Sequence, residues 1–172
     1  GCRNVAFAGG VALNATMNGK IARSGLVDNI FIQPEAGDSG GALGAAYAGY
    51  VRLGHSLLPK EMPHAYWGKG FTDDEIAEAL DIVKIKYHRL LPDEIAEYVA
   101  SALADSKIVG WFQGRSEWGP RALGARSILG DPRTREMLYQ VNAAVKYRDG
   151  WRPFAPSMLE EVADEYLEGA TY

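Results

Sequence analysis

The fold is decided first by the stretch VAFAGGVALN at residues 5–14, which joins an apolar run to two glycines and the start of a helical pattern. The apolar residues 5–8 predict a short buried strand, and residues 11–23 predict a helix. The same order returns downstream, in a strand predicted over residues 29–33 and a helix predicted over residues 42–53. Two strand–turn–helix units in tandem are typical of an α/β sheet.

The rest of the chain divides into a linker and a second region. Residues 56–70 predict a linker, because prolines and glycines occur there without an apolar period. The elements expected beyond it are helices over residues 72–80, 92–104, 134–145 and 160–167, and strands over residues 83–88, 108–112 and 126–129. The predicted fold class is therefore α/β, with mixed α+β sheets, divided as residues 1–55, the linker and residues 71–172.

Length and composition are those of a globular chain: 172 residues, of which 47% are hydrophobic and 23% charged. No run of about 18 apolar residues occurs, no secretory leader pattern is visible, and the single Cys2 cannot form an internal disulfide. These features predict a cytoplasmic protein with no membrane partner. Because the chain opens without Met, just before an apolar stretch, we also expect it to be a piece of a longer protein.

The charge of the chain is unevenly distributed. The net charge is −4, which argues against a nucleic-acid partner. Residues 114–152 nevertheless hold eight basic and four acidic residues, while the remainder is acidic. A basic region in an acidic chain predicts a focused anion site. Solvated arginines scattered over a surface are an equally good interpretation of the charge alone.

Two glycine-containing turns are candidate ligand sites. Gly9 and Gly10 allow a ligand to approach the backbone at a helix start, and Asn14 can bind a ribose or a base. The alternative is a tight turn with a surface Asn. Asp38 stands among glycines before a helix, where it either caps the helix or holds a divalent metal ion; the residues by themselves favour the cap.

Two cationic stretches are candidate anion sites. Residues 114–124, GRSEWGPRALG, place Arg115 and Arg121 in a loop stiffened by Gly and Pro. The forked guanidinium group matches phosphate or carboxylate, and the alternative is a surface pair between Arg and Glu117. The second stretch runs from Asn142 to Phe154.

Lys146 closes a predicted helix within this second stretch, and Arg152 precedes a Pro-Phe pair. A lysine at a helix C-terminus can simply complement the helix dipole. Arg121, Lys146 and Arg152 would be costly to cluster without an anion between them, although their spacing does not establish that they converge.

Taken in chain order, the motifs at residues 9–14, 34–46, 112–124, 126–133 and 152–156 resemble the O-carbamoyltransferases of the NodU/CmcH type. The resemblance runs over nearly the whole chain, and its most specific runs are GPRALG at residues 119–124 and RPFAP at residues 152–156. Trp118 is a departure, because Phe is the commoner residue there.

The resemblance implies an enzyme of two domains. An actin-like ATPase-type domain carries iron and the acceptor site, and a domain similar to the threonylcarbamoyl-adenylate synthases activates carbamoyl phosphate with ATP. The carbamoyl adenylate then passes its carbamoyl group to a hydroxyl of a nodulation-factor-, antibiotic- or sugar-like acceptor. Residues 1–55 are expected to be the end of the first domain and residues 71–172 part of the second, and the isolated piece is expected to be inactive.

The resemblance also implies roles for single residues. Gly9, Gly10 and Asn14 match an adenylate-binding turn, and Asp38 matches a ligand of Fe(II), in place of the helix cap. Arg121, Lys146 and Arg152 match positions that bind phosphate. We also expect Arg115 to help bind the cofactor, and Mg²⁺ can accompany ATP.

The expected partners are carbamoyl phosphate, ATP, a hydroxyl acceptor and, through an exposed sheet edge, a second copy of the chain. Two alternatives to an enzyme stay open on the sequence: a non-catalytic nucleotide- or anion-binding module, and an interaction domain.

Overall fold

The computed structural model of the chain describes residues 2–57 and 62–168. Its contacts divide the chain into two compact units. Unit 1 consists of residues 1–70 with residues 114–125, and unit 2 consists of residues 71–113 with residues 126–172. Among the described residues, no helix is both long and apolar enough to cross a membrane.

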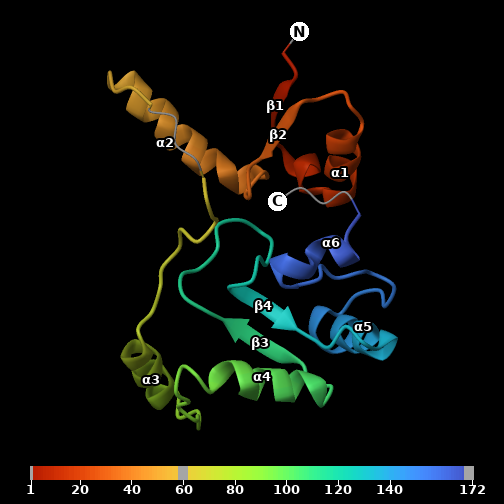
Figure 1. The fold of residues 1–172 in the computed structure, drawn as a ribbon. Helices are drawn as coiled ribbons and strands as arrows, with labels where there is room; N and C mark the ends of the chain where they lie inside the picture. Colours follow the sequence, from red (N-terminus) through yellow and green to blue (C-terminus); the bar gives the residue numbers. More distant parts are fainter. Residues whose placement is uncertain (1, 58–61, 169–172) are drawn as a thin grey trace. The chain divides into compact units, whose positions relative to one another are not determined.

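Unit 1 contains a two-stranded parallel sheet (Figure 1). β1 (Asn4–Phe7) pairs with β2 (Asn29–Ile32). The crossover between them holds the 3-10 helix η1 (Gly10–Leu13) and α1 (Ala15–Arg23), and β2 leads through η2 (Asp38–Gly40) into α2 (Gly41–Arg52). The predicted order of strand, turn and helix, repeated twice, is confirmed. The first helical segment forms the crossover that two parallel strands require.

The helix predicted over residues 11–23 is in fact two helices, separated by Asn14. Asn14 has an extended backbone, and its Oδ1 accepts a hydrogen bond from the Met17 N–H at 3.1 Å. An Asn at this position satisfies a free N–H group in the first turn of α1 and so starts a new helix. Gly9 precedes η1 with a φ of +98°, a conformation that favours glycine.

Unit 2 combines helices with a two-stranded antiparallel sheet. β3 (Val109–Phe112) pairs with β4 (Arg126–Leu129), and α4 (Ile95–Ala104) precedes β3 and contacts it (Figure 1). α3 (Asp73–Ile82) begins with the predicted capping box of Thr72 and Glu75. After β4 come α5 (Arg135–Val141), the π-helical η3 (Asn142–Lys146), η4 (Glu160–Val162) and α6 (Ala163–Tyr166). The predicted class of mixed helices and strands is confirmed.

The strand predicted over residues 83–88 is wrong. α3 ends at Ile82, Lys84 takes a left-handed conformation with a φ of +57°, and the residues that follow have no regular secondary structure. The apolar side chains of Val83 and Ile85 stay 60% and 54% exposed. An alternating pattern forms a strand only where a neighbouring strand pairs with its backbone. Within the described residues, no strand pairs with this segment.

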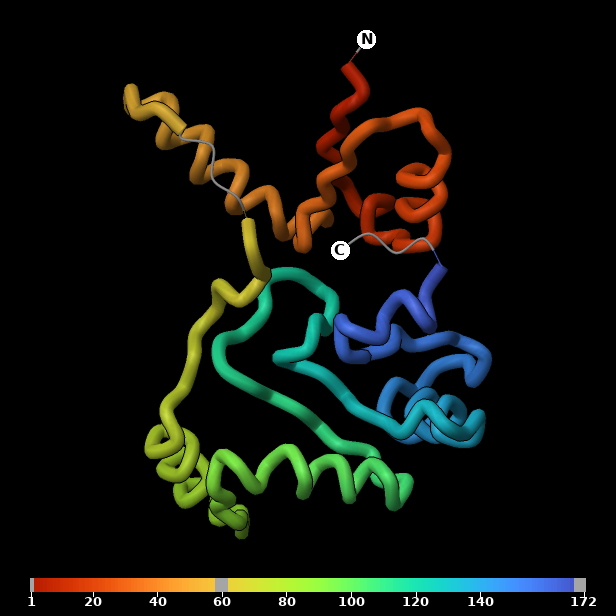
Figure 2. The backbone as a smooth tube through the Cα atoms, in the orientation of Figure 1, coloured from red at the N-terminus to blue at the C-terminus, as the bar shows by residue number. Residues whose placement is uncertain are grey.

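The two units differ from the division expected from chain order. The described part of the expected linker belongs to unit 1, and its residues 58–61 lie outside the described residues. Residues 114–125 also belong to unit 1, although the chain enters them from β3 and leaves them into β4 (Figure 2). The Trp118 N–H donates to the Ala65 carbonyl at 2.6 Å, and the Gly68 N–H donates to the Ser116 carbonyl at 2.8 Å. These bonds pair the segment with the described end of the expected linker.

Candidate functional site

The turn between β1 and α1 is the first candidate site. A Cβ added at Gly9 or Gly10 would meet no heavy atom within 4 Å, so open space adjoins the backbone there. Asn14 is exposed and uses its Oδ1 to cap α1. Its side-chain N–H groups make no hydrogen bond to the described residues. The turn therefore offers an approachable backbone and an amide donor, which suit a polar ligand such as a nucleotide.

Asp38 begins η2, just before α2. The N-cap of α2 is Gly40, and no side chain caps this helix, so the interpretation of Asp38 as a helix cap is wrong. The carboxylate is exposed and makes no hydrogen bond or ion pair within residues 2–57 and 62–168. Among those residues, no group of three or more His, Cys, Asp and Glu side chains is arranged so that it could hold a metal ion. Because an iron site needs several ligands, the described residues by themselves do not fit one.

The loop of residues 114–125 is held together from within by Glu117. This side chain is only 5% exposed, and its Oε1 accepts hydrogen bonds from the Leu123 N–H at 2.8 Å and the Ala125 N–H at 2.7 Å. The expected surface position of Glu117 is therefore wrong, because the carboxylate is buried and accepts hydrogen bonds from backbone amides. Burial of a carboxylate requires such partners.

Arg115 and Arg121 both donate to backbone carbonyls of unit 1. Arg115 binds the carbonyls of Gly68 and Trp67, each at 2.9 Å. Arg121 Nη2 donates to the Leu13 carbonyl at 3.0 Å, across a sequence separation of 108 residues. Arg121 thus lies beside the first candidate site. This contact could not be predicted from the sequence, since no local pattern reports a bond over that separation.

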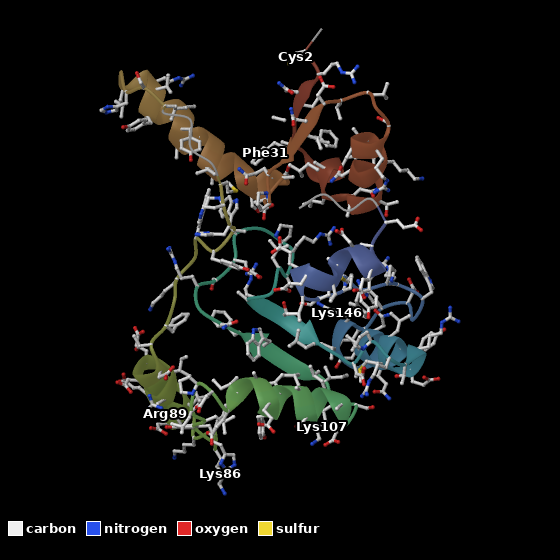
Figure 3. All side chains as sticks on the ribbon, in the orientation of Figure 1. Cys2, Phe31, Lys86, Arg89, Lys107 and Lys146 are labelled. Atoms are coloured by element: carbon white, nitrogen blue, oxygen red, sulfur yellow. The ribbon has the colours of Figure 1, made fainter. Side chains whose placement is uncertain are left out.

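The second cationic stretch follows α5. The helix predicted over residues 134–145 changes from α to π at Asn142 and ends at Lys146, and Tyr147 is left-handed with a φ of +48°. Lys146 (Figure 3) is exposed and forms no ion pair with a described residue. Arg152 Nε lies 3.8 Å from the Asp149 carboxylate in an exposed ion pair. The segment therefore presents two accessible cations.

Asn142 organises this stretch, a role that the sequence analysis did not assign to it. The side chain is fully buried, and its Nδ2 donates to the carbonyls of Gly150 at 3.2 Å and Arg152 at 3.0 Å. Its Oδ1 accepts from Arg148 Nε at 2.6 Å. One signal could have revealed it: Asn142 stands four residues after Leu138, where an amphipathic helix would carry an apolar side chain.

Part of the basic segment is structural. Arg133 Nη2 lies 2.6 Å from Asp131 Oδ2, and the same nitrogen donates to the Ala104 carbonyl at 3.2 Å. Hydrogen bonds from the Arg133 side chain, and secondarily from its backbone N–H, hold the pKa of Asp131 below its ordinary value. The pair ties the start of α5 to the end of α4, so Arg133 serves the fold of unit 2.

The predicted site residues fall into two groups. Unit 2 holds Lys146 and Arg152, whereas unit 1 holds all the others, namely Gly9, Gly10, Asn14, Asp38, Arg115 and Arg121. Convergence of Arg121 with Lys146 and Arg152 on one phosphate stays a prediction, because Arg121 belongs to the other unit. A surface hollow of about 510 Å³, lined by Asp81 and residues 84–88, contains none of these residues.

Comparison with known proteins gives matches at both ends of the chain. A family model described as "Carbamoyltransferase N-terminus" matches residues 1–47, and one described as "Carbamoyltransferase C-terminus" matches residues 100–172. The first match covers both turns of unit 1 that carry candidate residues. The second covers the loop with Arg121 and the whole stretch from Asn142 to Arg152.

Three relatives are similar over almost the entire chain. Nodulation protein NolNO of Sinorhizobium fredii is 47% identical, nodulation protein NolO of Bradyrhizobium diazoefficiens is 46% identical, and an uncharacterized protein of Synechocystis is 45% identical. Each alignment covers 98% of this chain. The chain spans only 25%, 31% and 28% of these relatives' own lengths.

Proposed function

Because the chain belongs to the carbamoyltransferase family, we propose that it is part of an enzyme that transfers a carbamoyl group to a hydroxyl of a small molecule. Carbamoyl phosphate is the proposed donor, and ATP activates it as carbamoyl adenylate. The acceptor is proposed to be a nodulation-factor-, antibiotic- or sugar-like compound. The names of the two nodulation-protein relatives support this class of acceptor.

The reactants and products of the proposed reaction balance. Carbamoyl phosphate, ATP, water and the acceptor alcohol give the carbamate ester, AMP, pyrophosphate and inorganic phosphate. In the activating half, water cleaves the bond between the carbamoyl group and phosphate, inorganic phosphate leaves, and an oxygen of the resulting carbamate bonds to the α-phosphorus of ATP as the bond to pyrophosphate breaks. In the transfer half, the acceptor oxygen bonds to the carbamoyl carbon and AMP leaves. The substrates bring several negative charges together, so the site must supply fixed cations.

The observation that carries the proposal is the pair of accessible cations at the two ends of residues 146–152. Lys146 has no acidic partner among the described residues, and the ion pair of Arg152 is long and exposed. Asn142 bonds to the backbone of the same turn. Cations held on an ordered turn bind an anion at a smaller entropic cost than mobile ones. A phosphate group of carbamoyl phosphate or ATP suits this arrangement.

Unit 1 is proposed to serve carbamoyl transfer from the adenylate. The open backbone at Gly9 and Gly10 and the amide of Asn14 support an adenylate site at this turn. Arg121 donates to the adjacent Leu13 carbonyl, and Arg115 holds the loop that carries Arg121. Asp38 is proposed as one ligand of an Fe(II) centre whose other ligands come from outside the described residues. Mg²⁺ is proposed to accompany ATP.

The test is pyrophosphate release by the full-length protein, with ATP and with or without carbamoyl phosphate. We expect Lys146→Ala and Arg152→Ala to abolish the release that depends on carbamoyl phosphate. Lys107→Ala is the matched control, because Lys107 is another exposed lysine of unit 2, and it pairs with Asp105 at 3.5 Å. It should leave the rate unchanged.

Two results would contradict the proposal. If the wild-type protein binds ATP but releases no pyrophosphate with carbamoyl phosphate, the chain belongs to a nucleotide-binding module without this activity. If release persists in Lys146→Ala, the family reaction stands and the assigned phosphate site is wrong.

A further inference from the structure

Asn142 is the one large residue whose side chain is fully buried among the described residues, with 0% exposure. A primary amide has two N–H donors and one carbonyl acceptor, and burying it is costly unless these groups find partners. Asn142 donates to two carbonyls and accepts from one guanidinium. All three partners, Arg148, Gly150 and Arg152, lie in a single stretch of five residues. The amide therefore holds this stretch and nothing else.

The backbone of Asn142 bonds to the same turn. Its carbonyl accepts hydrogen bonds from the N–H groups of Tyr147 and Arg148, the second at 3.1 Å. The bond from Tyr147 spans five residues, as in a π-helix, and Tyr147 caps this helix in a left-handed conformation. π-helical turns are rare and occur frequently at functional sites. The cost of this irregular turn is offset by the hydrogen bonds that converge on Asn142.

This turn carries Lys146 and Arg152, two of the exposed cations of unit 2. Lys146 is the last residue of η3, and its Cα position follows from where the π-helical turn ends. Arg152 is held through its own carbonyl, which accepts the 3.0 Å bond from Asn142 Nδ2. Its guanidinium carbon lies 5.8 Å from the centre of the Trp151 ring. Asn142 thus connects the start of the turn to its end through hydrogen bonds of its backbone carbonyl and its side chain.

We propose that Asn142 is a positioning residue that sets the separation and direction of Lys146 and Arg152, so that the two cations bind one phosphate group together. The inference rests on the proposed function for the identity of the ligand, carbamoyl phosphate. Asn142 itself does not touch the ligand, because its side chain is buried and its polar atoms are engaged.

Steady-state kinetics of the full-length protein test the proposal through two substitutions. Asn142→Ala removes all three side-chain hydrogen bonds. Asn142→Asp keeps the shape and one acceptor, but it sets an oxygen against the carbonyls of Gly150 and Arg152. We expect both variants to raise the KM for carbamoyl phosphate by on the order of tenfold to a hundredfold, because small displacements of binding groups are costly, with a smaller change in kcat.

Val141→Ala is the matched control. Val141 is the preceding residue and is also buried, but its side chain makes no hydrogen bond to the turn. This variant should lower the melting temperature while leaving the KM for carbamoyl phosphate unchanged. Should the Asn142 variants fail to fold, Arg148→Ala removes the bond to Asn142 Oδ1 together with the contact to the Phe154 ring, leaves the two bonds from Asn142 Nδ2, and should still raise this KM.

Calorimetric titration with inorganic phosphate separates this inference from the proposed reaction. Phosphate binding that is present in the wild-type protein and lost in Asn142→Ala and Lys146→Ala supports the positioning role, even if no turnover is found. The inference is overturned by any of three results: an unchanged KM in Asn142→Ala, an equal rise of KM in Val141→Ala, or no phosphate binding by the wild-type protein.

Discussion

The arginine side chains of residues 114–152 use their N–H groups in different ways. Arg115 binds two backbone carbonyls, and Arg133 is paired with Asp131. Arg148 donates to Asn142, and its guanidinium carbon lies 4.8 Å from the centre of the Phe154 ring. The count of charges predicted an anion site, but the count treats these residues as equivalent. Which cations can reach an anion depends on local partners.

The pair of Asp131 and Arg133 makes stability depend on pH in a predictable direction. The pKa of Asp131 is lowered in the folded chain from an ordinary value of 3.8. The unfolded chain therefore binds the proton more readily, so the pair stabilises the fold above this value and the contribution is lost as pH falls through the lowered pKa. We expect Asp131→Asn to be less stable at neutral pH, with a melting temperature that falls less between pH 5 and pH 2.

A melting series over pH checks this prediction. Asp105→Asn serves as the control for loss of an acidic residue, because Asp105 pairs with Lys107 in an exposed bridge at 3.5 Å and such bridges contribute little. An equal fall of the melting temperature of the wild type and of Asp131→Asn between pH 5 and pH 2 would contradict the prediction.

At the scale of elements, the loop of residues 114–125 contains three glycines whose backbone conformation disfavours other residues. Gly114, Gly119 and Gly124 have φ values of +65°, +104° and +108°. A Cβ at Gly119 would lie 2.6 Å from the Pro34 carbonyl oxygen, whereas a Cβ at Gly114 would meet nothing within 4 Å. Two glycines with positive φ thus differ in whether a side chain has room.

This difference predicts unequal effects of the same substitution. Gly114→Ala should cost about 1 kcal/mol, the ordinary penalty for a left-handed alanine. Gly119→Ala should cost about 3 kcal/mol, because it adds a steric clash with a backbone that cannot easily move. Urea denaturation measures both. Equal midpoints for the two variants would show that residues 34 and 119 are not packed as described.

Elements were predicted well where the pattern was local. The capping box at residues 72–75 and the order of strand, turn and helix in residues 4–52 followed from residue types and their order. The errors are of two kinds. Asn14 and Asn142 each interrupt a helix that periodicity alone continued, because their side chains bind backbone groups. The strand expected at residues 83–88 does not form, since its pattern says nothing about whether a partner strand exists.

For the molecule as a whole, the exposed surface is large for the mass. The chain exposes 13710 Å², whereas a compact monomer of 18.7 kDa would expose about 8,300 Å², and two separate domains of half that mass about 10,000 Å². Phe31 is 50% exposed on β2 (Figure 3). Within the described residues, β1 and β2 each have a single neighbouring strand. Exposed sheet edges with apolar side chains favour association.

We therefore expect a polypeptide of these 172 residues to self-associate, and we propose the sheet of unit 1 as the contact. Light scattering over a range of concentrations should show a mass that rises above that of one chain. Phe31→Lys should shift the rise to a higher concentration. Leu53→Lys, which adds the same charge at another exposed apolar residue, the C-cap of α2, should not. A monomer at all concentrations would contradict the prediction.

The class of fold, the order of most elements and the motifs that place the chain in its family could all be predicted from the sequence, because they depend on residue type and short spacing. Only the tertiary structure placed residues 114–125 in unit 1, with Arg121 on the Leu13 carbonyl. Only it showed Asn142 bound to the turn that carries Lys146 and Arg152. The physical reason is common to both. A buried polar group or a guanidinium binds whichever backbone groups the folded chain brings near. The local periodicity of the sequence does not predict which groups these are.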